Sequence, residues 1–234
     1  MGSGEMPKML QPILGKPILG WLLQSVQKSG LDPEPAIVVG HGVEFIKEAC
    51  GDKYIYIEQR ELLGTGDAVK QARPFFEGKV ENLLVLYGDH PFISAEVLQN
   101  LVKTHVRDRR VLTMITTVVP DFLDWRVTFR DYGRIVRDEY RRIQKIVEVK
   151  DANDAEREIR ELNTGIYCWR ASWLWPHLDK LRNNNAQKEY LLTDLLALAI
   201  AEGQEVATVS IDAKECLGIN NPEQLKSIEK LFGS

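Results

Sequence analysis

The sequence of 234 residues has few of the features that define disulfide-rich, zinc-ribbon or membrane proteins. Its three cysteines, Cys50, Cys168 and Cys216, are far apart and form no Cys-x-x-Cys pair. This spacing argues against a zinc ribbon and predicts a reduced protein without a disulfide framework. No apolar run reaches the ~18 residues that a membrane helix needs, and no signal-peptide pattern precedes the first motif. We therefore expect a cytoplasmic protein that contacts no membrane.

Charge of one sign is not in excess either. Thirty Lys and Arg residues stand against 34 Asp and Glu residues, which gives a net charge of −4. This balance argues against a nucleic-acid-binding surface, although a local basic pocket is compatible with it. Apolar residues make up 44% and charged residues 27% of the chain, as in ordinary globular domains.

Apolar runs alternate with helical patterns in the first half of the chain. AIVV (36–39) and LLVL (83–86) are continuous apolar runs, which are typical of strands covered on both faces in a parallel sheet. Helical spacing predicts helices between such runs. The predicted helices are 17–29, 43–49, 64–72 and 94–106, and the predicted strands are 36–40, 54–58, 82–89 and 111–119.

The pattern of predicted strands and helices changes after about residue 120. Short β-like runs at 134–136 and 145–149 lie among charged loops. They are followed by a strand at 161–169, helices at 171–181 and 193–202, a strand at 205–211 and a last helix from Pro222. The pattern predicts an α/β fold with a Rossmann-like, doubly wound, mostly parallel sheet and a smaller mixed lobe. We expect one domain with a nucleotide-binding half (about 1–120) and a second half (about 121–234).

Candidate site residues follow the predicted strands, where ligands of such sheets bind. Asp89 leaves a buried strand after Gly88, which suits a Mg²⁺ ligand, but capping of the helix near Ser94 is an equal alternative. His90 is interpreted as structural, because oxygen ligands suit magnesium. Tyr87 and Gln59 also stand at strand ends, and the Gln59 amide is suited to reading a nucleobase.

Two further signals lie near the start of the chain. In LGTG, Gly64 and Thr65 open a helix and present backbone N–H groups to an anion or a base, or form a plain tight turn. Lys8 follows Pro7, so its ammonium can be held over phosphates, although a lone surface lysine is the simpler interpretation.

The second half offers weaker signals. Gly133, Glu148 and Asn163 are flexible or polar points among apolar neighbours, and each is equally compatible with a bulge, a surface charge or a turn. Asn220 precedes the last helix and could donate a neutral oxygen to a metal. Capping that helix is the alternative role, and Asn221, next to Pro222, fits the cap better.

Together these motifs resemble one family. The order PK…L…GKP, VVGHG, EQxxLGTGDA, LYGDxPxI, YGRI, VExKDA, NTG, NNNAQxEYxLTD and LGxNxPEQL is similar to that of the sugar-1-phosphate nucleotidyltransferases. Within this family it is most similar to the uridylyltransferase domains of the bifunctional enzymes that make UDP-N-acetylglucosamine. The resemblance runs from Pro7 to about Leu231, and NNNAQKEYLLTD and ELLGTGDA are its most specific segments.

The resemblance implies a reaction and a set of roles. A sugar-1-phosphate, with N-acetylglucosamine-1-phosphate expected, attacks the α-phosphorus of UTP in line and releases pyrophosphate. Asp89 and Asn220 are expected to bind Mg²⁺, and Lys8 and Asp89 to act catalytically. The expected nucleotide-binding residues are Lys8, Gln59, Gly64, Thr65, Tyr87 and Gly88; those around the sugar are Gly133, Glu148 and Asn163, with Tyr190 and Thr193 less directly placed.

The sequence departs from the family pattern in three places. Nothing like the first strand and glycine-rich loop, LAAGxGTRM, precedes MGSGEMPK. A wrong start codon, an artificial truncation or a divergent form would explain this, and we expect the 234-residue chain to be poorly stable or inactive. WRVTFRDYGRI is longer than the usual approach to YGRI, which leaves the sugar open. No hexapeptide-repeat region follows, so we expect no C-terminal left-handed β-helix acyltransferase domain.

Two other functions fit part of the pattern. A degenerate family member without the phosphate loop would be a non-catalytic nucleotide- or sugar-binding module. A glycosyltransferase that uses nucleotide sugars ranks lower, because that class needs paired acidic residues at the metal and LYGDHPF offers Asp89 alone. The oligomeric state, monomer or dimer, stays open.

Overall fold

The structure is a computed structural model that describes residues 6–232. The opening MGSG, on which the prediction of a missing loop rests, lies outside these residues. The first half of the chain forms a 3-10 turn (Lys8–Leu10), β1 (Pro12–Ile13), β2 (Lys16–Pro17), α1 (Ile18–Ser29), β3 (Ala36–Val39), α2 (Val43–Cys50), β4 (Ile55–Glu58), α3 (Thr65–Gln71), α4 (Arg73–Phe76), β5 (Asn82–Val85), α5 (Ala95–Asp108) and β6 (Leu112–Val118).

The second half completes the fold. It forms a 3-10 helix (Asp124–Asp131), β7 (Arg134–Arg137), β8 (Ile143–Val147), α6 (Asp154–Arg157), β9 (Glu161–Arg170), α7 (Ala171–Leu178), α8 (Asp194–Ala201), β10 (Val206–Ser210) and α9 (Pro222–Phe232). The 3-10 helix and the short helices α4 and α6 follow from no periodic pattern in the sequence. The longer predicted elements are present, with ends that differ by a few residues.

The main sheet is mixed rather than mostly parallel. Its order is β10-β6-β9-β7-β8, and β5 pairs with β9 beside this path. β10 and β6 are parallel, as are β3 and β4 in a separate sheet, whereas β9 runs antiparallel to β5, β6 and β7. A continuous apolar run indicates that both faces of a strand are buried, but it does not indicate whether the neighbouring strand runs parallel or antiparallel. The predicted α/β class is confirmed, and strands from both predicted halves share the sheet.

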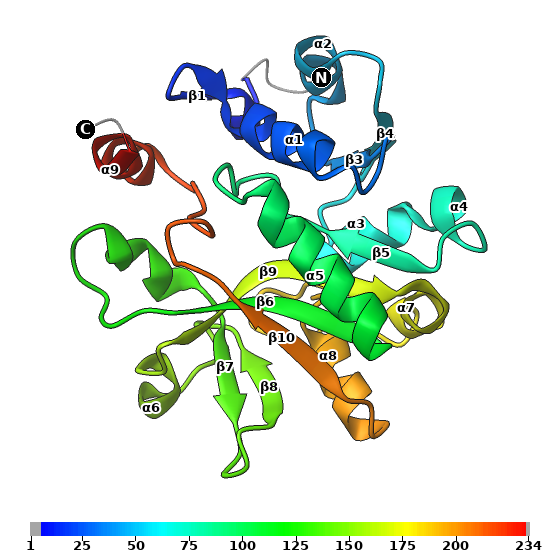
Figure 1. The fold of residues 1–234 in the computed structure, drawn as a ribbon, viewed down its shortest axis with the longest axis vertical. Helices are drawn as coiled ribbons and strands as arrows, with labels where there is room; N and C mark the ends of the chain where they lie inside the picture. The colour runs from blue at the N-terminus through cyan, green and yellow to red at the C-terminus, as the bar shows by residue number, and fades with distance from the viewer. Residues whose placement is uncertain (1–5, 233–234) are drawn as a thin grey trace.

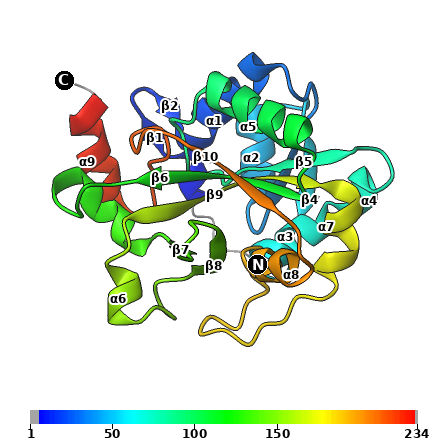
Figure 2. The ribbon, with the colours of Figure 1, turned by 60° about the horizontal axis from the view of Figure 1, so that its bottom comes forward.

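Helices cover both faces of this sheet. Met114 and Tyr167 pack on one face with leucines of α7 and α8, while Ile115 and Ile166 pack on the other with α1 and α5. Successive strand residues point to opposite faces, so this alternation gives each strand two buried sides. Figure 2 shows α1 and α5 on one side of the sheet and α3 and α8 on the other.

Local signals explain where several helices begin and end. The Ser94 hydroxyl accepts a hydrogen bond from the Val97 amide at 3.3 Å, which is the predicted N-cap of α5. Gly30 ends α1 in the left-handed region, with φ of 67°. These signals account for the correct prediction of α1 and α5, which lie side by side in Figure 1.

β9 has a bulge beside the candidate site. Residues 164–166 of β9 lie opposite the single residue Ile115 of β6, between the pairs Met114–Tyr167 and Thr116–Asn163. The Thr164 hydroxyl donates to the Ile115 carbonyl at 2.9 Å and holds the bulge closed. β5 ends where its pairing with β9 reaches Val85 and Tyr167. The predicted strand 82–89 therefore stops early, and residues 86–89 form a loop.

Candidate functional site

A cavity of about 260 Å³ lies beyond the end of β5, beside the bulge of β9. Residues from both halves of the chain line it, as predicted for a site at strand ends. The predicted residues among them are Thr65, Tyr87, Asp89, Gly133, Glu148, Asn163, Thr193 and Asn220. The others are His90, Asp131, Tyr132, Thr164, Gly165, Gln187 and Leu191, for which the sequence predicts no binding role. The roles of all of these residues stay predictions.

The side chains of the two predicted metal ligands, Asp89 and Asn220, both lie close to the Lys8 ammonium. The Lys8 ammonium donates to Asn220 Oδ1 at 2.9 Å and lies 3.7 Å from Asp89 Oδ2. The Ile219 amide donates to the Asp89 carbonyl at 3.0 Å, so a backbone bond brings the loop after β5 against the segment before α9. Three residues that are far apart in the sequence thus lie together, with the Lys8 ammonium against one oxygen each of Asp89 and Asn220.

The helix cap is separate from this cluster. The Asn221 side chain accepts a hydrogen bond from the Gln224 amide at 2.9 Å at the start of α9. This confirms the interpretation of Asn221 as the cap and leaves the Asn220 side chain for Lys8. Ser94 caps α5, so Asp89 is not needed there.

The donor set fits a magnesium ion that keeps part of its water shell. Asp89 Oδ1 is buried, and no described residue gives it a hydrogen bond. A buried carboxylate oxygen without a partner is costly unless a cation or donor reaches it. Within residues 6–232 no group of three or more His, Cys, Asp and Glu side chains could hold a metal. Mg²⁺ is commonly bound by one or two carboxylates together with water and substrate phosphates, so the oxygens of Asp89 and Asn220 are chemically suited to such an ion.

His90 packs between aromatic neighbours beside Asp89. Its ring stacks on Tyr132 at 6.1 Å and meets the Tyr87 ring edge-on at 6.3 Å. The Tyr132 hydroxyl donates to the Cys216 carbonyl at 2.9 Å and accepts from the Gly218 amide at 2.8 Å. Burial lowers the pKa of His90, so the neutral ring is favoured. These contacts agree with a structural His90 that also walls the cavity.

The GTG loop is clamped by the chain after α7. The Gly66 amide donates to the Tyr190 carbonyl at 2.8 Å, and the Tyr190 amide donates to the Leu63 carbonyl at 2.7 Å. The Leu192 amide donates to Thr65 Oγ1 at 3.0 Å. A Cβ on Gly64 would lie 2.7 Å from the Tyr190 carbonyl oxygen, which only glycine avoids. Tyr190 therefore acts on the site through its backbone, and its side chain does not line the cavity.

Gln59 is fixed by its amide nitrogen. Gln59 Nε2 donates to the Gly64 carbonyl at 3.1 Å and to Asp67 Oδ2 at 2.8 Å. Because both partners are hydrogen-bond acceptors, the amide nitrogen, which is a donor, must be the atom that faces them. The amide oxygen is the atom that remains for a ligand with an N–H donor. Gln59, like Lys8, Gly64 and Gly88, borders the lining residues without being one of them.

The second side of the cavity is polar and buried. Glu148 Oε1 accepts a hydrogen bond from the Thr193 hydroxyl at 3.2 Å, and its second oxygen remains. Burial raises the pKa of Glu148, a trend that the Thr193 hydrogen bond opposes. Asn163 Oδ1 accepts from the Tyr167 hydroxyl at 2.9 Å and from the Gly165 amide at 3.2 Å. A carboxylate oxygen and a fixed amide are suited to hydroxyl groups of a small polar ligand.

Gly165 is a site residue that only the structure reveals. Its φ is 77°, and an added Cβ would lie 2.5 Å from Tyr87 Cε2. The Tyr87 ring thus rests on the bulge of β9, in contact with backbone. The sequence places this glycine in NTG, but its positive φ and its contact with Tyr87 arise from the pairing of distant strands.

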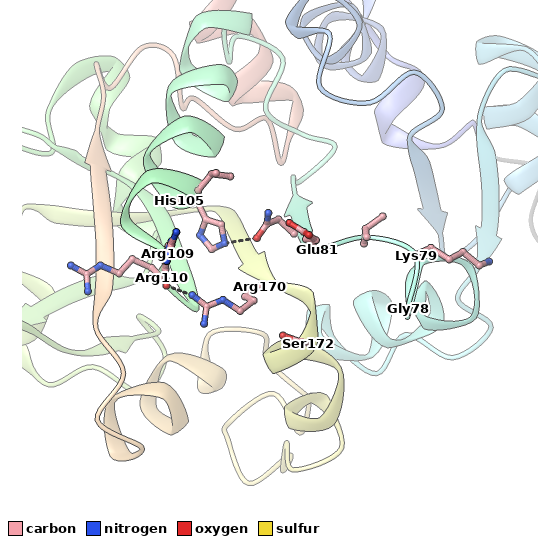
Figure 3. Close-up of a pocket in the computed structure, with 11 residues that line it drawn as sticks. Gly78, Lys79, Glu81, His105, Arg109, Arg110, Arg170 and Ser172 are labelled. Atoms are coloured by element: carbon pink, nitrogen blue, oxygen red, sulfur yellow. Dashed lines mark hydrogen bonds between the residues drawn. The ribbon is translucent and has the colours of Figure 1, made fainter.

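A larger, basic cavity of about 690 Å³ lies at the other end of β5 (Figure 3). Arg170 there donates to the Arg109 carbonyl at the end of α5, and Arg110 pairs with Glu205. Buried His105 bonds Thr113 Oγ1 at 3.0 Å and Asn82 Oδ1 at 3.1 Å. These contacts tie α5 to the sheet. The cavity lies at the amino ends of β5 and β6, whereas such folds bind ligands at the carboxyl ends of their parallel strands.

Comparison with known proteins gives the family. A family model described as nucleotidyl transferase matches residues 3–215. The bifunctional protein GlmU of Brevibacillus brevis is 39% identical over 228 residues, 97% of this chain and 48% of the relative. The bifunctional protein GlmU of Acetivibrio thermocellus is 39% identical over 230 residues, again 97% and 48%. The chain therefore spans about half the length of these curated relatives.

Solved structures agree on the fold. A UDP-glucose pyrophosphorylase complexed with UDP-glucose has a TM-score of 0.77 at 16% identity, over 97% of this chain and 90% of the other. A CMP:2-keto-3-deoxy-manno-octonic acid synthetase complexed with CTP has a TM-score of 0.70 at 18% identity, over 99% and 94%. Among the described helices, none combines the length and apolar composition needed to cross a membrane. The family match, the identity to the curated relatives and the shared fold together show that this chain belongs to the nucleotidyl transferase family.

Proposed function

We propose that this chain transfers a uridylyl group from UTP to a sugar-1-phosphate, with N-acetylglucosamine-1-phosphate as the expected acceptor. The observation that carries the proposal is the cluster of Lys8, Asp89 and Asn220 at the edge of the cavity. One phosphate oxygen of the sugar phosphate attacks the α-phosphorus of UTP, the bond from that phosphorus to the bridging oxygen breaks, and pyrophosphate leaves with the electron pair.

Charge neutralisation is the main task of the cluster. The Lys8 ammonium donates to Asn220 Oδ1 at 2.9 Å, and its proposed role is to contact phosphate oxygens. Asp89 and Asn220 would hold Mg²⁺, which members of such families typically use and which would neutralise phosphate charge and orient both reactants. The chain itself supplies fixed positions, because in phosphoryl and nucleotidyl transfer most of the acceleration comes from orientation and electrostatics.

The base preference is inferred from Gln59 and the GTG loop. The Gln59 amide nitrogen is engaged by Gly64 and Asp67, so its oxygen is left to accept a hydrogen bond. The ring N–H of uracil supplies such a donor. Thr65 lines the cavity and is held through the Leu192 amide, which keeps the base side of the site rigid. UTP is therefore the proposed nucleotide, and thymidine triphosphate, which has the same ring N–H, is the informative comparison.

The test is a product assay with the purified chain. Activity in this assay would also refute the expectation, drawn from the opening MGSG, that the 234-residue chain is poorly stable or inactive. UTP, N-acetylglucosamine-1-phosphate and Mg²⁺ are expected to give UDP-N-acetylglucosamine and pyrophosphate in equal amounts, and omission of either substrate is expected to stop both. Thymidine and cytidine triphosphates and glucose-1-phosphate define the base and sugar preference. Absence of a nucleotide sugar with every combination would contradict the proposal, and a different best pair would correct its substrate.

A further inference from the structure

Gln187 lines the cavity and lies in one of the specific segments of the family pattern, but the resemblance implies no role for it. It belongs to the loop between α7 and α8 that contains NNNAQKEY, drawn in gold in Figure 2. The same cavity holds Glu148, Asn163 and Thr193, the residues proposed for the sugar. Gln187 therefore extends this polar wall from a third part of the chain.

The backbone on both sides of Gln187 is held by hydrogen bonds. Asn185 Nδ2 donates to the Glu189 carbonyl at 2.6 Å, and the Glu189 amide donates to Asn185 Oδ1 at 3.1 Å. The next residue, Tyr190, is joined to the GTG loop through the Leu63 carbonyl and the Gly66 amide. Gln187 thus projects from a short arch closed by Asn185 and Glu189, so its position at the cavity is built into the loop.

The amide oxygen of Gln187 is buried, and no described residue donates a hydrogen bond to it. Most buried polar side-chain atoms in proteins have a partner, and an unpaired one carries a desolvation penalty. The Asn163 oxygen in the same cavity, by contrast, already accepts from Tyr167 and Gly165. An unpaired acceptor on the wall of a polar cavity is suited to a ligand that brings an N–H or O–H donor.

Resting on the proposed function, we propose that Gln187 is a specificity-determining residue of the sugar subsite. Its amide oxygen accepts a hydrogen bond from an N–H or O–H group of the sugar-1-phosphate. A sugar without a donor at that position leaves the buried oxygen unpaired and is rejected, because buried polar groups discriminate strongly against ligands that lack their partner. Gln187 acts on recognition of the acceptor and not on the base.

The experiment compares ligands that differ in the sugar alone. Dissociation constants for UDP, UDP-glucose and UDP-N-acetylglucosamine are measured by calorimetry with the full chain, its Gln187→Met variant and an Asn184→Met control. Methionine matches glutamine in reach but lacks a strong acceptor. Asn184 is an amide in the same loop that lies outside the lining of the cavity. For Gln187→Met we expect UDP-N-acetylglucosamine to bind about tenfold more weakly, equivalent to ~1.4 kcal/mol, with UDP unchanged within about twofold.

The pattern of losses identifies the donor. Loss with both nucleotide sugars assigns a donor position that both carry, either a shared hydroxyl or the group on C2. Loss confined to UDP-N-acetylglucosamine assigns its amide N–H, and either result supports the proposal. Unchanged binding of both sugars overturns it. A parallel loss for UDP also overturns it, because a purely structural role would act through Tyr190 on the GTG loop.

Folding and the proposed function are checked separately. Unfolding midpoints show whether each variant is folded, and Gln187→Asn, which keeps the amide but shortens it by one methylene, is expected to lose the same sugar-dependent affinity. If the unchanged chain forms nucleotide sugar but neither Gln187 variant alters sugar binding, the inference fails and the proposed function stands. If the unchanged chain forms no nucleotide sugar, the proposed function fails.

Discussion

Replacement of Gly165 by alanine tests how the bulge of β9 supports the site. The added Cβ would lie 2.5 Å from Tyr87 Cε2 and 2.7 Å from Tyr87 Cδ2, distances at which the ring must move. Gly165 also has a φ of 77°, which disfavours alanine whatever the available space. Tyr87 lines the cavity, so the substitution is expected to lower both stability and activity.

The two contributions are separated by a matched control. Gly203, with φ of 72°, has no described heavy atom within 4 Å of an added Cβ. Gly203→Ala therefore measures the backbone term alone, ~1–2 kcal/mol for an L residue in the left-handed region. Displacement of the Tyr87 ring adds ~1–3 kcal/mol, the usual range for overpacking. Gly165→Ala is expected to lose about 2–5 kcal/mol of the free energy of unfolding.

Urea unfolding at pH 7, followed by far-UV circular dichroism, gives the free energies for the unchanged chain and both variants. The comparison is valid if the dependence on urea has the same slope for all three. Pyrophosphate release measured on the same preparations is expected to fall for Gly165→Ala and to stay unchanged for Gly203→Ala. Equal destabilisation by the two substitutions would refute the contact between Gly165 and Tyr87.

Three further predictions follow from the side-chain contacts. Thr65→Ala removes the acceptor of the Leu192 amide, so the free energy of unfolding should fall by ~1–3 kcal/mol. The KM for UTP should rise, while the KM for the sugar phosphate should stay unchanged. Asn221→Ala removes the cap of α9 at Gln224, and thermal unfolding should report ~0.5–2 kcal/mol lost with kcat unchanged; a large fall in kcat would assign Asn221 to the site. Burial lowers the pKa of His105 to about 4, below its ordinary value near 6.5. The unfolded chain then binds the proton more readily, so stability should fall as the pH falls from about 6.5 to 4, by ~2–3 kcal/mol; His105→Gln should remove this part of the pH dependence, and an unaltered profile would contradict it.

The sequence indicates residues such as Asp89 and Asn220 as candidates, because a few adjacent positions show the residue type and the strand or helix beside it. Asp89 follows an apolar run, and Asn220 precedes a helix whose cap is supplied by Asn221. Their convergence depends on a backbone bond between Ile219 and Asp89, and no local pattern contains that bond. The sequence thus indicates which residue types suit the site, while the pairing of distant segments determines which of them meet.

The remaining lining residues are not predictable for the same reason. Gly165 lies in a bulge defined by the register of β9 against β6, and Tyr132 is placed by hydrogen bonds to Cys216 and Gly218. Gln187 stands in a loop whose path is set by the clamp on the GTG segment. The antiparallel direction of β9 does not follow from the sequence, because a buried strand has the same apolar composition in either direction.

The central claim is that Asp89 and Asn220 would hold Mg²⁺ at the reacting phosphates, whose negative charge the Lys8 ammonium also offsets. The most direct test is the rate of pyrophosphate release from UTP with N-acetylglucosamine-1-phosphate and Mg²⁺, for the unchanged chain, Asp89→Asn and the control Asp52→Asn. Asp52 is an exposed carboxylate that pairs only weakly with Lys47, at 3.4 Å. We predict that Asp89→Asn lowers the rate by about a hundredfold or more without shifting the unfolding midpoint by more than the control does. A rate for Asp89→Asn within a few-fold of the unchanged chain would contradict the claim.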